Sequence, residues 1–136
     1  MVTLKHTRGC VYQPAYHLVW HPVYRRSVLA EPVKRTLENL FYTIAHQYDM
    51  ELLAVDVQPD HFHLFVSIPP ALAVADAVKL LKGISARRLR LMFPDLRTRT
   101  RSDRLWAPSY YVGTAGHVLA DTIRKYIESQ EQHHAQ

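Results

Sequence analysis

The sequence predicts an α+β domain in which an antiparallel sheet carries helices on one face. Four short stretches rich in valine and aromatic residues have the period-two pattern of half-buried strands. Two longer stretches have apolar residues at the three- and four-residue spacing of amphipathic helices. Their order along the chain is strand, helix, strand, strand, helix, strand. This order is typical of sheets whose helices are gathered on one side.

The first strand is expected within residues 11–20, where valine and tyrosine are frequent. Because Pro14 has no backbone N–H to donate, the strand begins after it or runs along a sheet edge there. His17 and His21 are interpreted as ordinary strand and loop residues. Alternation places Tyr16, Leu18 and Trp20 on one face of this strand, and His17 and Val19 on the other.

A core-packing helix is expected from Glu31 and Pro32 to about Tyr48, because proline suits a first helical turn and apolar residues follow at helical spacing. Residues 51–57 are expected to form the second strand. A short turn at residues 58–60 joins it to the third strand as a hairpin. The apolar positions of the helix are Val33, Leu37, Leu40, Phe41 and Ile44.

The third strand carries His61 and His63, separated by Phe62 and followed by an apolar run. Alternation directs both imidazoles to one face and Phe62 to the opposite face, where it anchors the core. Two neutral imidazoles at this spacing can bind one divalent ion, but they supply only part of its coordination shell. A half-exposed polar strand face is the alternative interpretation.

A second helix is expected over residues 73–92, with Val74, Val78, Leu81, Ser85 and Met92 on its apolar side. Arg88 falls among these positions, so it must extend its head group to solvent, meet a carboxylate or mark a bend. The helix also has a basic stripe suited to a phosphate backbone, or simply a solvated face. The stripe comprises Lys79, Lys82 and Arg90 around Ala86, with Arg87 at its border.

Phe93 and Pro94 end this helix, and residues 95–104 are expected to form a mobile basic loop, since they carry arginines without apolar periodicity. The fourth strand is expected over residues 106–112. Residues 113–116 are expected to turn the chain into a last helix over about 117–132. The order βαββαβ predicts a ferredoxin-like, RRM-like antiparallel sheet with helices on one face, plus a C-terminal helix.

The composition favours a polyanionic partner. The 136 residues are expected to form a single domain over 1–136, with its core at about 11–112. Lys and Arg outnumber Asp and Glu by 17 to 12, which gives a formal charge of +5. Arg25 and Arg26, beside Tyr24, form a candidate phosphate and base contact, although a solvated loop is the alternative. A lone cysteine, no apolar run of membrane-spanning length and no signal-peptide core predict a cytoplasmic protein without a membrane partner.

The last predicted helix directs two polar side chains toward protein. Tyr126 and Gln130 share its apolar face with Leu119, Ile123 and Ile127. They are either a buried tyrosine with a satisfied glutamine, or a nucleophile and a metal ligand one turn apart. The residues alone leave both interpretations open.

Four features in this order together resemble the small single-tyrosine transposases of the HUH class, which move hairpin-ended insertion sequences of the 200/605 type as single-stranded DNA. They are the strand with His61-Phe62-His63, the basic helix from Lys79 to Arg88, the stretch from Leu105 to Tyr110, and the final helix from Tyr126 to Gln130. The resemblance covers nearly the whole chain.

The resemblance implies that His61, His63 and Gln130 hold a Mg²⁺ or Mn²⁺ ion and that Tyr126 is the nucleophile. It implies cleavage and rejoining of single-stranded DNA at hairpin-bearing element ends through a 5′-phosphotyrosine. It also implies a homodimer in which the tyrosine helix of one subunit completes the site of the other in trans. One departure is visible, because Val23 stands where lysine is often found.

Two further classes of function remain open from the sequence. A noncatalytic, RRM-like binder of single strands would share the fold and the basic faces, but it would not need Tyr126 and Gln130 one turn apart. A replication initiator, a relaxase or a domesticated nickase acting on host repeats would share the chemistry. The chain's small size, without an added helicase or primase domain, disfavours the first two of these.

Overall fold

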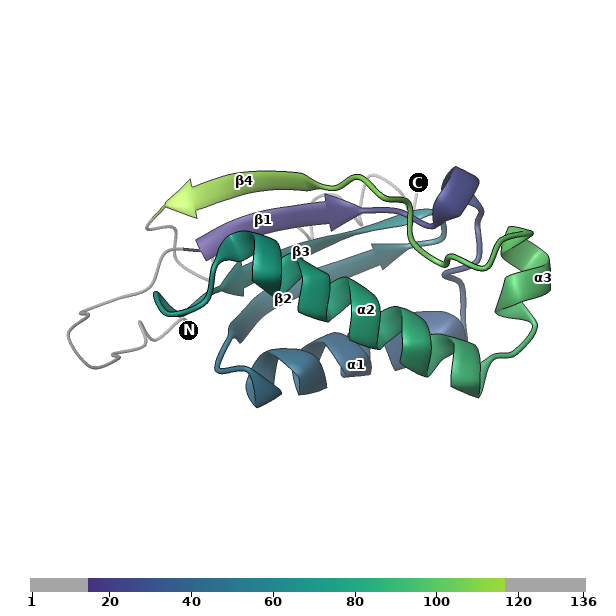
Figure 1. Ribbon diagram of the computed structural model, residues 1–136, viewed down its shortest axis with the longest axis horizontal. Coiled ribbons are helices and arrows are strands. Elements are labelled where there is room, and N and C mark those ends of the chain that lie inside the picture. Colours follow the sequence, from purple (N-terminus) through teal and green to yellow (C-terminus); the bar gives the residue numbers. More distant parts are fainter. Residues whose placement is uncertain (1–14, 117–136) are drawn as a thin grey trace, which may run out of the picture.

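A computed structural model describes residues 15–116 of the chain, and within them the predicted ferredoxin-like fold is confirmed (Figure 1). One four-stranded antiparallel sheet has the strand order β2-β3-β1-β4. Its strands are β1 (Ala15–Trp20), β2 (Glu51–Gln58), β3 (His61–Ser67) and β4 (Tyr111–Gly116). The helices α1 (Val33–Gln47) and α2 (Val74–Met92) cover one face. The short helix α3 (Leu96–Thr100) and the 3-10 turn η1 (Val23–Arg25) lie at one end of the sheet.

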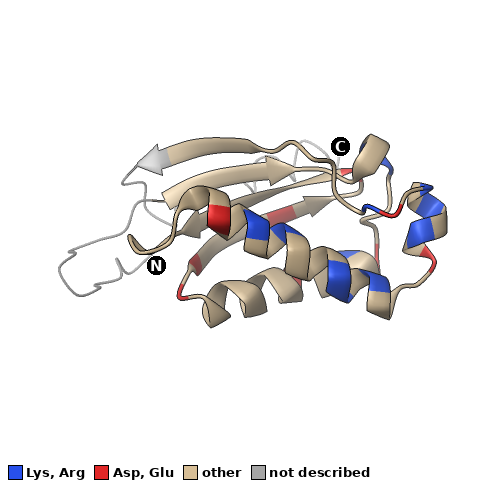
Figure 2. Cartoon of the chain, viewed as in Figure 1, with Lys and Arg blue, Asp and Glu red and all other residues tan. Residues whose placement is uncertain are grey.

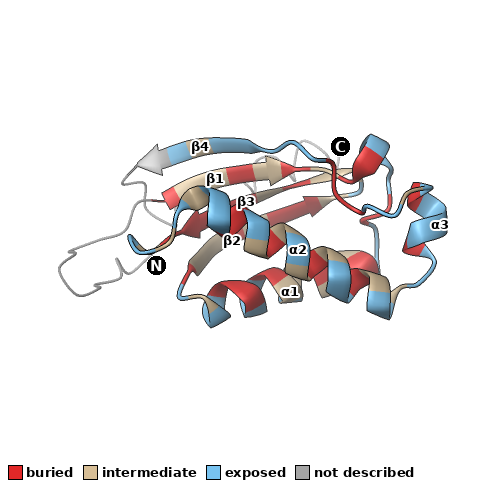
Figure 3. Cartoon of the chain, in the orientation of Figure 1, coloured by how far each residue is buried: buried red, intermediate tan, exposed pale blue. Residues whose placement is uncertain are grey.

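The main core lies between the sheet and the two long helices, as the alternation of side chains predicts. Trp20 on β1 and Phe62 on β3 are fully buried, and their rings meet edge to face with centroids 4.6 Å apart. Phe41 on α1 packs on Phe62 with centroids 4.9 Å apart. Figure 3 shows the buried residues gathered between these elements. The aromatic cluster fixes the face of β3 that points inward, so His61 and His63 project from the opposite, open face.

The open face has its own small apolar cluster, formed by Ala15, Ala54 and Phe65. Directly opposed residues of neighbouring strands share a face, so the strand register identifies the neighbours of the histidines. His63 lies opposite Val19 of β1 on one side and Asp56 of β2 on the other. The histidine pair therefore sits on a sheet surface lined by residues from three strands.

The region expected to be a mobile basic loop contains a helix instead. In α3, Leu96 and Thr100 are buried, and the Thr100 hydroxyl donates a hydrogen bond to the carbonyl oxygen of Leu96 at 2.9 Å. The two residues lie four positions apart, so they share one face of a helical turn. The intervening arginines hide this short pattern from a search for longer apolar periodicity, and the prediction of a loop here is wrong.

The fourth strand also lies further along the chain than predicted. β4 begins at Tyr111 and includes residues 113–116, which were expected to form a turn. The aromatic stretch before it is irregular, with Trp106 forming an isolated bridge to Pro22 and donating its indole N–H to the buried Ser85 hydroxyl at 3.0 Å. Pro108 has no amide hydrogen for a strand ladder. The predicted fourth strand is present, but the predicted bounds of 106–112 match it only at residues 111 and 112, and the prediction of a turn at 113–116 is wrong.

Two positions on α2 differ from the predicted faces. Met92, expected on the apolar side, is 57% exposed at the end of the helix. Arg88, which was expected among the apolar positions, is also exposed, so its side chain is not part of the buried face of the helix. The buried face of α2 consists of Ala77, Val78, Leu81, Ser85 and Leu89.

Candidate active site

His61 and His63 form the centre of the candidate site, at the end of the sheet where β3 begins. Both side chains are partly buried, and their rings meet edge to face with centroids 5.2 Å apart. The sequence prediction that both project from one face agrees with the strand geometry. Each ring also has a specific hydrogen-bond partner at Nδ1, and the two partners come from different elements.

Asp60, in the turn between β2 and β3, orients His61. The Asp60 Oδ1 lies 2.8 Å from the Nδ1 of His61. An ionised carboxylate can only accept, so the Nδ1–H of His61 is the donor, and in the neutral ring Nε2 then carries the lone pair. The hydrogen bond with His61 holds the pKa of the Asp60 carboxyl below its ordinary value, assisted by the charge of Arg25, while partial burial opposes the shift. Asp60 is therefore ionised at neutral pH.

His17, on β1, orients His63. The Nε2 of His17 lies 2.9 Å from the Nδ1 of His63, and the His17 ring stacks on Phe65 with centroids 4.4 Å apart and planes 5° apart. Burial lowers the pKa of His17, which favours the neutral ring.

From the sequence, His17 is expected to be an ordinary strand residue. A signal for it exists, because a ferredoxin-like strand order brings β1 beside β3 and places His17 diagonally across from His63.

The described residues supply some, but not all, of the ligands that a divalent metal ion needs. Two imidazoles on one face can contribute two nitrogens, but within residues 15–116 no group of three His, Cys, Asp or Glu side chains could hold a metal. Asp56, directly opposite His63, is buried and accepts a hydrogen bond from the Gln58 side chain at 2.9 Å. The two other predicted site residues, Tyr126 and Gln130, lie outside the described residues.

Arg25 and Arg26 lie at the 3-10 turn η1 that follows β1, and Arg25 is linked to the histidine pair through Asp60. An ion pair of 3.4 Å links the guanidinium of Arg25 to the second carboxylate oxygen of Asp60. Arg26 packs 5.9 Å from the ring centre of Tyr24, which is 69% exposed. Tyr24 and Arg25 both have positive φ angles, of 58° and 50°. This turn presents two exposed cations and one exposed aromatic ring, and Arg25 contacts the carboxylate that orients His61.

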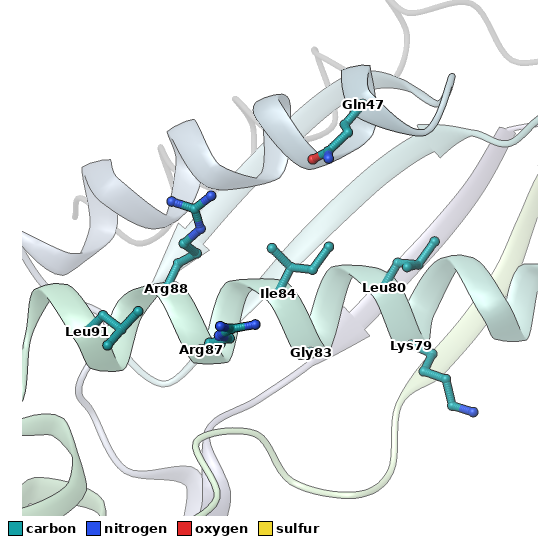
Figure 4. A pocket seen from close by; sticks show the side chains of 8 residues that line it. All are labelled: Gln47, Lys79, Leu80, Gly83, Ile84, Arg87, Arg88 and Leu91. Atoms are coloured by element: carbon teal, nitrogen blue, oxygen red, sulfur yellow. The ribbon is translucent and has the colours of Figure 1, made fainter.

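The cations of α2 do not form one uniformly exposed stripe. Lys79 and Arg87 are exposed and border a groove of about 490 Å³ beside α1, with Leu80 and Ile84 between them (Figure 4). Arg88 extends toward α1 in the same view. Figure 2 shows the basic residues of α2 and α3 distributed along the helical side of the domain.

Lys82 and Arg90 face other parts of the protein. The Lys82 ammonium donates to the carbonyl oxygens of Ala107 at 2.7 Å and Pro108 at 3.3 Å, and burial lowers its pKa. In Arg90, Nε and one terminal nitrogen are buried without a hydrogen-bond partner among the described residues. Burial, followed by repulsion from Arg97, lowers the pKa of Arg90. Lys82 and Arg90 are therefore partly engaged within the protein, and Lys79 and Arg87 are the more accessible cations of α2 for a phosphate backbone.

An antiparallel sheet with two histidines side by side on its open face is the arrangement expected of the HUH class, and comparisons with known proteins identify the family. The family model described as "Transposase IS200 like" matches residues 10–130. The chain belongs to this IS200-like transposase family, and so to a family of enzymes of DNA transposition.

Two curated relatives agree with this assignment. The ISDra2 transposase TnpA of Deinococcus radiodurans is 42% identical over 127 residues, which cover 93% of this chain and 91% of the relative. The transposase for insertion sequence element IS200 of Salmonella typhimurium is 31% identical over 128 residues, covering 94% and 82%.

Solved structures support the fold. A crystal structure of a Deinococcus radiodurans protein described as a transposase has a TM-score of 0.77 at 41% identity, covering 93% of this chain and 98% of that one. A REP-associated tyrosine transposase bound to a REP hairpin has a TM-score of 0.58 at 13% identity, covering 92% and 68%, and it supports the fold alone. Within the described part of the chain, no helix is long and apolar enough to cross a membrane.

Proposed function

We propose that this transposase cleaves and rejoins single-stranded DNA at the hairpin-bearing ends of its insertion sequence, through a 5′-phosphotyrosine on Tyr126. The observation that carries the proposal is the pair His61 and His63, held together on the open sheet face by Asp60 and His17. Family membership supplies the reaction class, because the relatives are transposases of insertion sequences.

The residues have distinct proposed roles. The phenolic oxygen of Tyr126 attacks the scissile phosphorus, the bond from phosphorus to the 3′ oxygen breaks, and the departing oxygen becomes a free 3′-OH. Because one phosphodiester replaces another, a second 3′-OH can reverse the step and join new ends without ATP. His61, His63 and Gln130 would hold a Mg²⁺ or Mn²⁺ ion, whose chemistry would be to polarise the phosphate and stabilise the departing oxygen.

The basic surfaces are proposed to hold the DNA backbone. Arg25 reaches the site through its ion pair with Asp60, Arg26 follows it in the chain, and the exposed ring of Tyr24 suits stacking on an unpaired base. Lys79 and Arg87 offer exposed cations on the helical side. The relative bound to a REP hairpin is consistent with hairpin DNA as the ligand. The protein is also proposed to act as a homodimer whose sites are completed in trans by the partner's Tyr126 and Gln130.

The test compares cleavage with binding. Wild-type protein, His61→Ala and His63→Ala are each incubated with Mg²⁺ and a labelled single-stranded oligonucleotide carrying the element end and its hairpin. Cleavage is expected to disappear in both variants, whereas hairpin affinity stays within about threefold, because the backbone contacts rest on the basic side chains. His46→Ala, which removes an exposed histidine from α1, is the matched control and should cleave normally. Near-normal cleavage by both site variants would contradict the proposal.

A further inference from the structure

The two candidate metal ligands are held in the same way by two different residues. His61 is engaged at Nδ1 by Asp60 at 2.8 Å, and His63 is engaged at Nδ1 by His17 at 2.9 Å. Asp60 comes from the hairpin turn and His17 from the middle of the neighbouring strand β1. The common feature is the ring nitrogen used, which determines the nitrogen that can bind a metal.

A ring nitrogen that carries a proton cannot bind a metal, so the hydrogen bond at the other nitrogen selects the ligating atom. For His61 the assignment follows from chemistry, since a carboxylate accepts only and Nδ1 must be the donor. For His63 the partner is another imidazole, which can either donate or accept. Only one of these arrangements gives His63 a lone pair at Nε2.

We propose that His17 is a positioning residue that accepts the Nδ1–H of His63 and thereby fixes Nε2 of His63 as a metal-binding nitrogen. The tautomers of the two neutral rings then follow. His63 carries its proton on Nδ1 and donates it to Nε2 of His17, and His17 carries its own proton on Nδ1. Asp60 has the equivalent role for His61. This inference rests on the proposed function, since it requires His61 and His63 to be the metal ligands.

The surroundings of His17 suit this role, because its ring is held in a defined plane. It stacks almost parallel on Phe65 with centroids 4.4 Å apart, and the edge of Tyr111 approaches it from β4 at 5.7 Å. Gly113, which lies opposite His17 in the strand register, leaves the space for Tyr111, since a Cβ there would lie 2.6 Å from the Tyr111 hydroxyl. Rings on both sides therefore restrict the direction in which the His17 Nε2 points.

The first measurement is the affinity of the full-length protein for Mn²⁺ alone, determined from the electron paramagnetic resonance signal of the free ion. His17→Phe keeps a stacked ring but removes the acceptor, so the dissociation constant is expected to rise by about 10- to 100-fold. His17→Gln can place an amide oxygen near the same point and is expected to restore most of the affinity. Tyr111→Phe changes a ring that contacts His17 without changing the hydrogen bond, and it should bind as the wild type does.

The second measurement reads the tautomer directly in the metal-free protein. Long-range ¹H–¹⁵N correlation spectra, with His63 assigned by comparison with His63→Ala, should show the Nδ1–H form in the wild type and a shift away from it in His17→Phe. A wild-type His63 that carries its proton on Nε2 would overturn the proposal, even if His17→Phe fails to fold. Unchanged Mn²⁺ affinity in a folded His17→Phe protein would also overturn it.

These outcomes are separate from failure of the proposed function. If Mn²⁺ binding by the wild type does not depend on His61 and His63, the metal assignment itself is wrong. If binding depends on those two residues but not on His17, only the positioning role is refuted. Thermal unfolding of each variant establishes that the comparison is made on folded protein.

Discussion

Lys79 and Lys82 are close neighbours on α2, yet their side chains have different surroundings. Lys79 is exposed, whereas Lys82 donates to the carbonyl oxygens of Ala107 and Pro108 and lies 5.6 Å from the ring centre of Tyr110. Hydrogen bonds from a charged donor contribute about 1.5–3 kcal/mol when buried, and less with partial exposure. The two lysines therefore allow the structural role of Lys82 to be tested apart from the proposed role of Lys79 in binding DNA.

We expect Lys82→Met to lower the free energy of unfolding by about 1–2 kcal/mol, and Lys79→Met to change it by less than about 0.5 kcal/mol. If Lys79 contacts a phosphate, its loss should reduce the slope of log affinity against log salt by about 0.7 for single-stranded DNA. Urea unfolding and binding titrations at several salt concentrations measure these effects. Equal stability of the two variants would show that the Lys82 hydrogen bonds contribute nothing measurable.

Ser85 and Trp106 provide a second test at the level of single residues. The indole N–H of Trp106 donates to the Ser85 hydroxyl at 3.0 Å, and both residues are buried. Ser85→Ala leaves that N–H without its acceptor, so we expect a loss of about 1–3 kcal/mol in the free energy of unfolding. Thr43→Ala, which removes an exposed hydroxyl from α1, should cause a much smaller loss. Denaturant unfolding compares them, and equal losses would contradict the importance of this bond.

The sequence predicts the two candidate ligands, His61 and His63, but not the residues that form hydrogen bonds with them. The His-x-His spacing indicated a shared face because strand side chains alternate, and that inference needs no knowledge of the fold. The roles of His17 and Asp60 depend on which strand lies beside β3 and on the turn geometry. Periodicity within one segment contains neither, so His17 was interpreted as an ordinary strand residue.

At the scale of elements, the chain was predictable where the apolar pattern is long and uninterrupted. The helices α1 and α2 and the hairpin of β2 and β3 meet this condition, and they were placed to within one or two residues. The stretch from Leu105 to Ala107 looks like a strand because it is apolar and aromatic, but side-chain contacts with α2 hold it in an irregular path. β4 is an edge strand that contains Gly113 and Gly116, and because glycine usually weakens a strand or marks a turn, these residues favoured a turn in the sequence.

Arg90 on α2 lies close enough to Arg97 on α3 for their charges to repel, so replacing it tests the packing between these two helices. Two of its guanidinium nitrogens are buried without a hydrogen-bond partner among the described residues, an arrangement that is unfavourable for stability. We expect Arg90→Met to raise the free energy of unfolding by about 1 kcal/mol, since methionine keeps the apolar stem without the buried polar atoms. Arg87→Met, at an exposed position on the same helix, should leave stability within about 0.5 kcal/mol. A loss of stability in Arg90→Met would instead indicate that the guanidinium has a stabilising partner.

At the scale of the whole molecule, the proposed active site requires more than the described domain. The sheet supplies His61 and His63, while Tyr126 and Gln130 are expected on the C-terminal helix. The family resemblance implies that this helix comes from the partner subunit. Residues 113–116, which were expected to turn the chain into this helix, belong to β4, so the trans arrangement rests on the resemblance and needs its own test.

Mixed subunits provide that test. We expect the double variant His61→Ala/His63→Ala and the variant Tyr126→Phe to be inactive separately and to recover cleavage when their subunits exchange. With trans sites, the heterodimer has one site in which every proposed residue is intact, whereas with cis sites each site carries a lesion. Subunit exchange is verified by differently sized tags. Absence of cleavage after complete exchange would refute the trans arrangement, although the same residues could still act in cis.

The proposed reaction depends most directly on a covalent bond between Tyr126 and DNA. The most direct measurement is to incubate the protein with Mg²⁺ and a labelled single-stranded element end, denature the mixture, and locate the adduct by peptide mass spectrometry. We expect a denaturation-resistant adduct on the peptide containing Tyr126 in the wild type, and none with Tyr126→Phe. An adduct of the same yield in Tyr126→Phe, or cleavage by the wild type with no covalent protein–DNA species at any time, would contradict it.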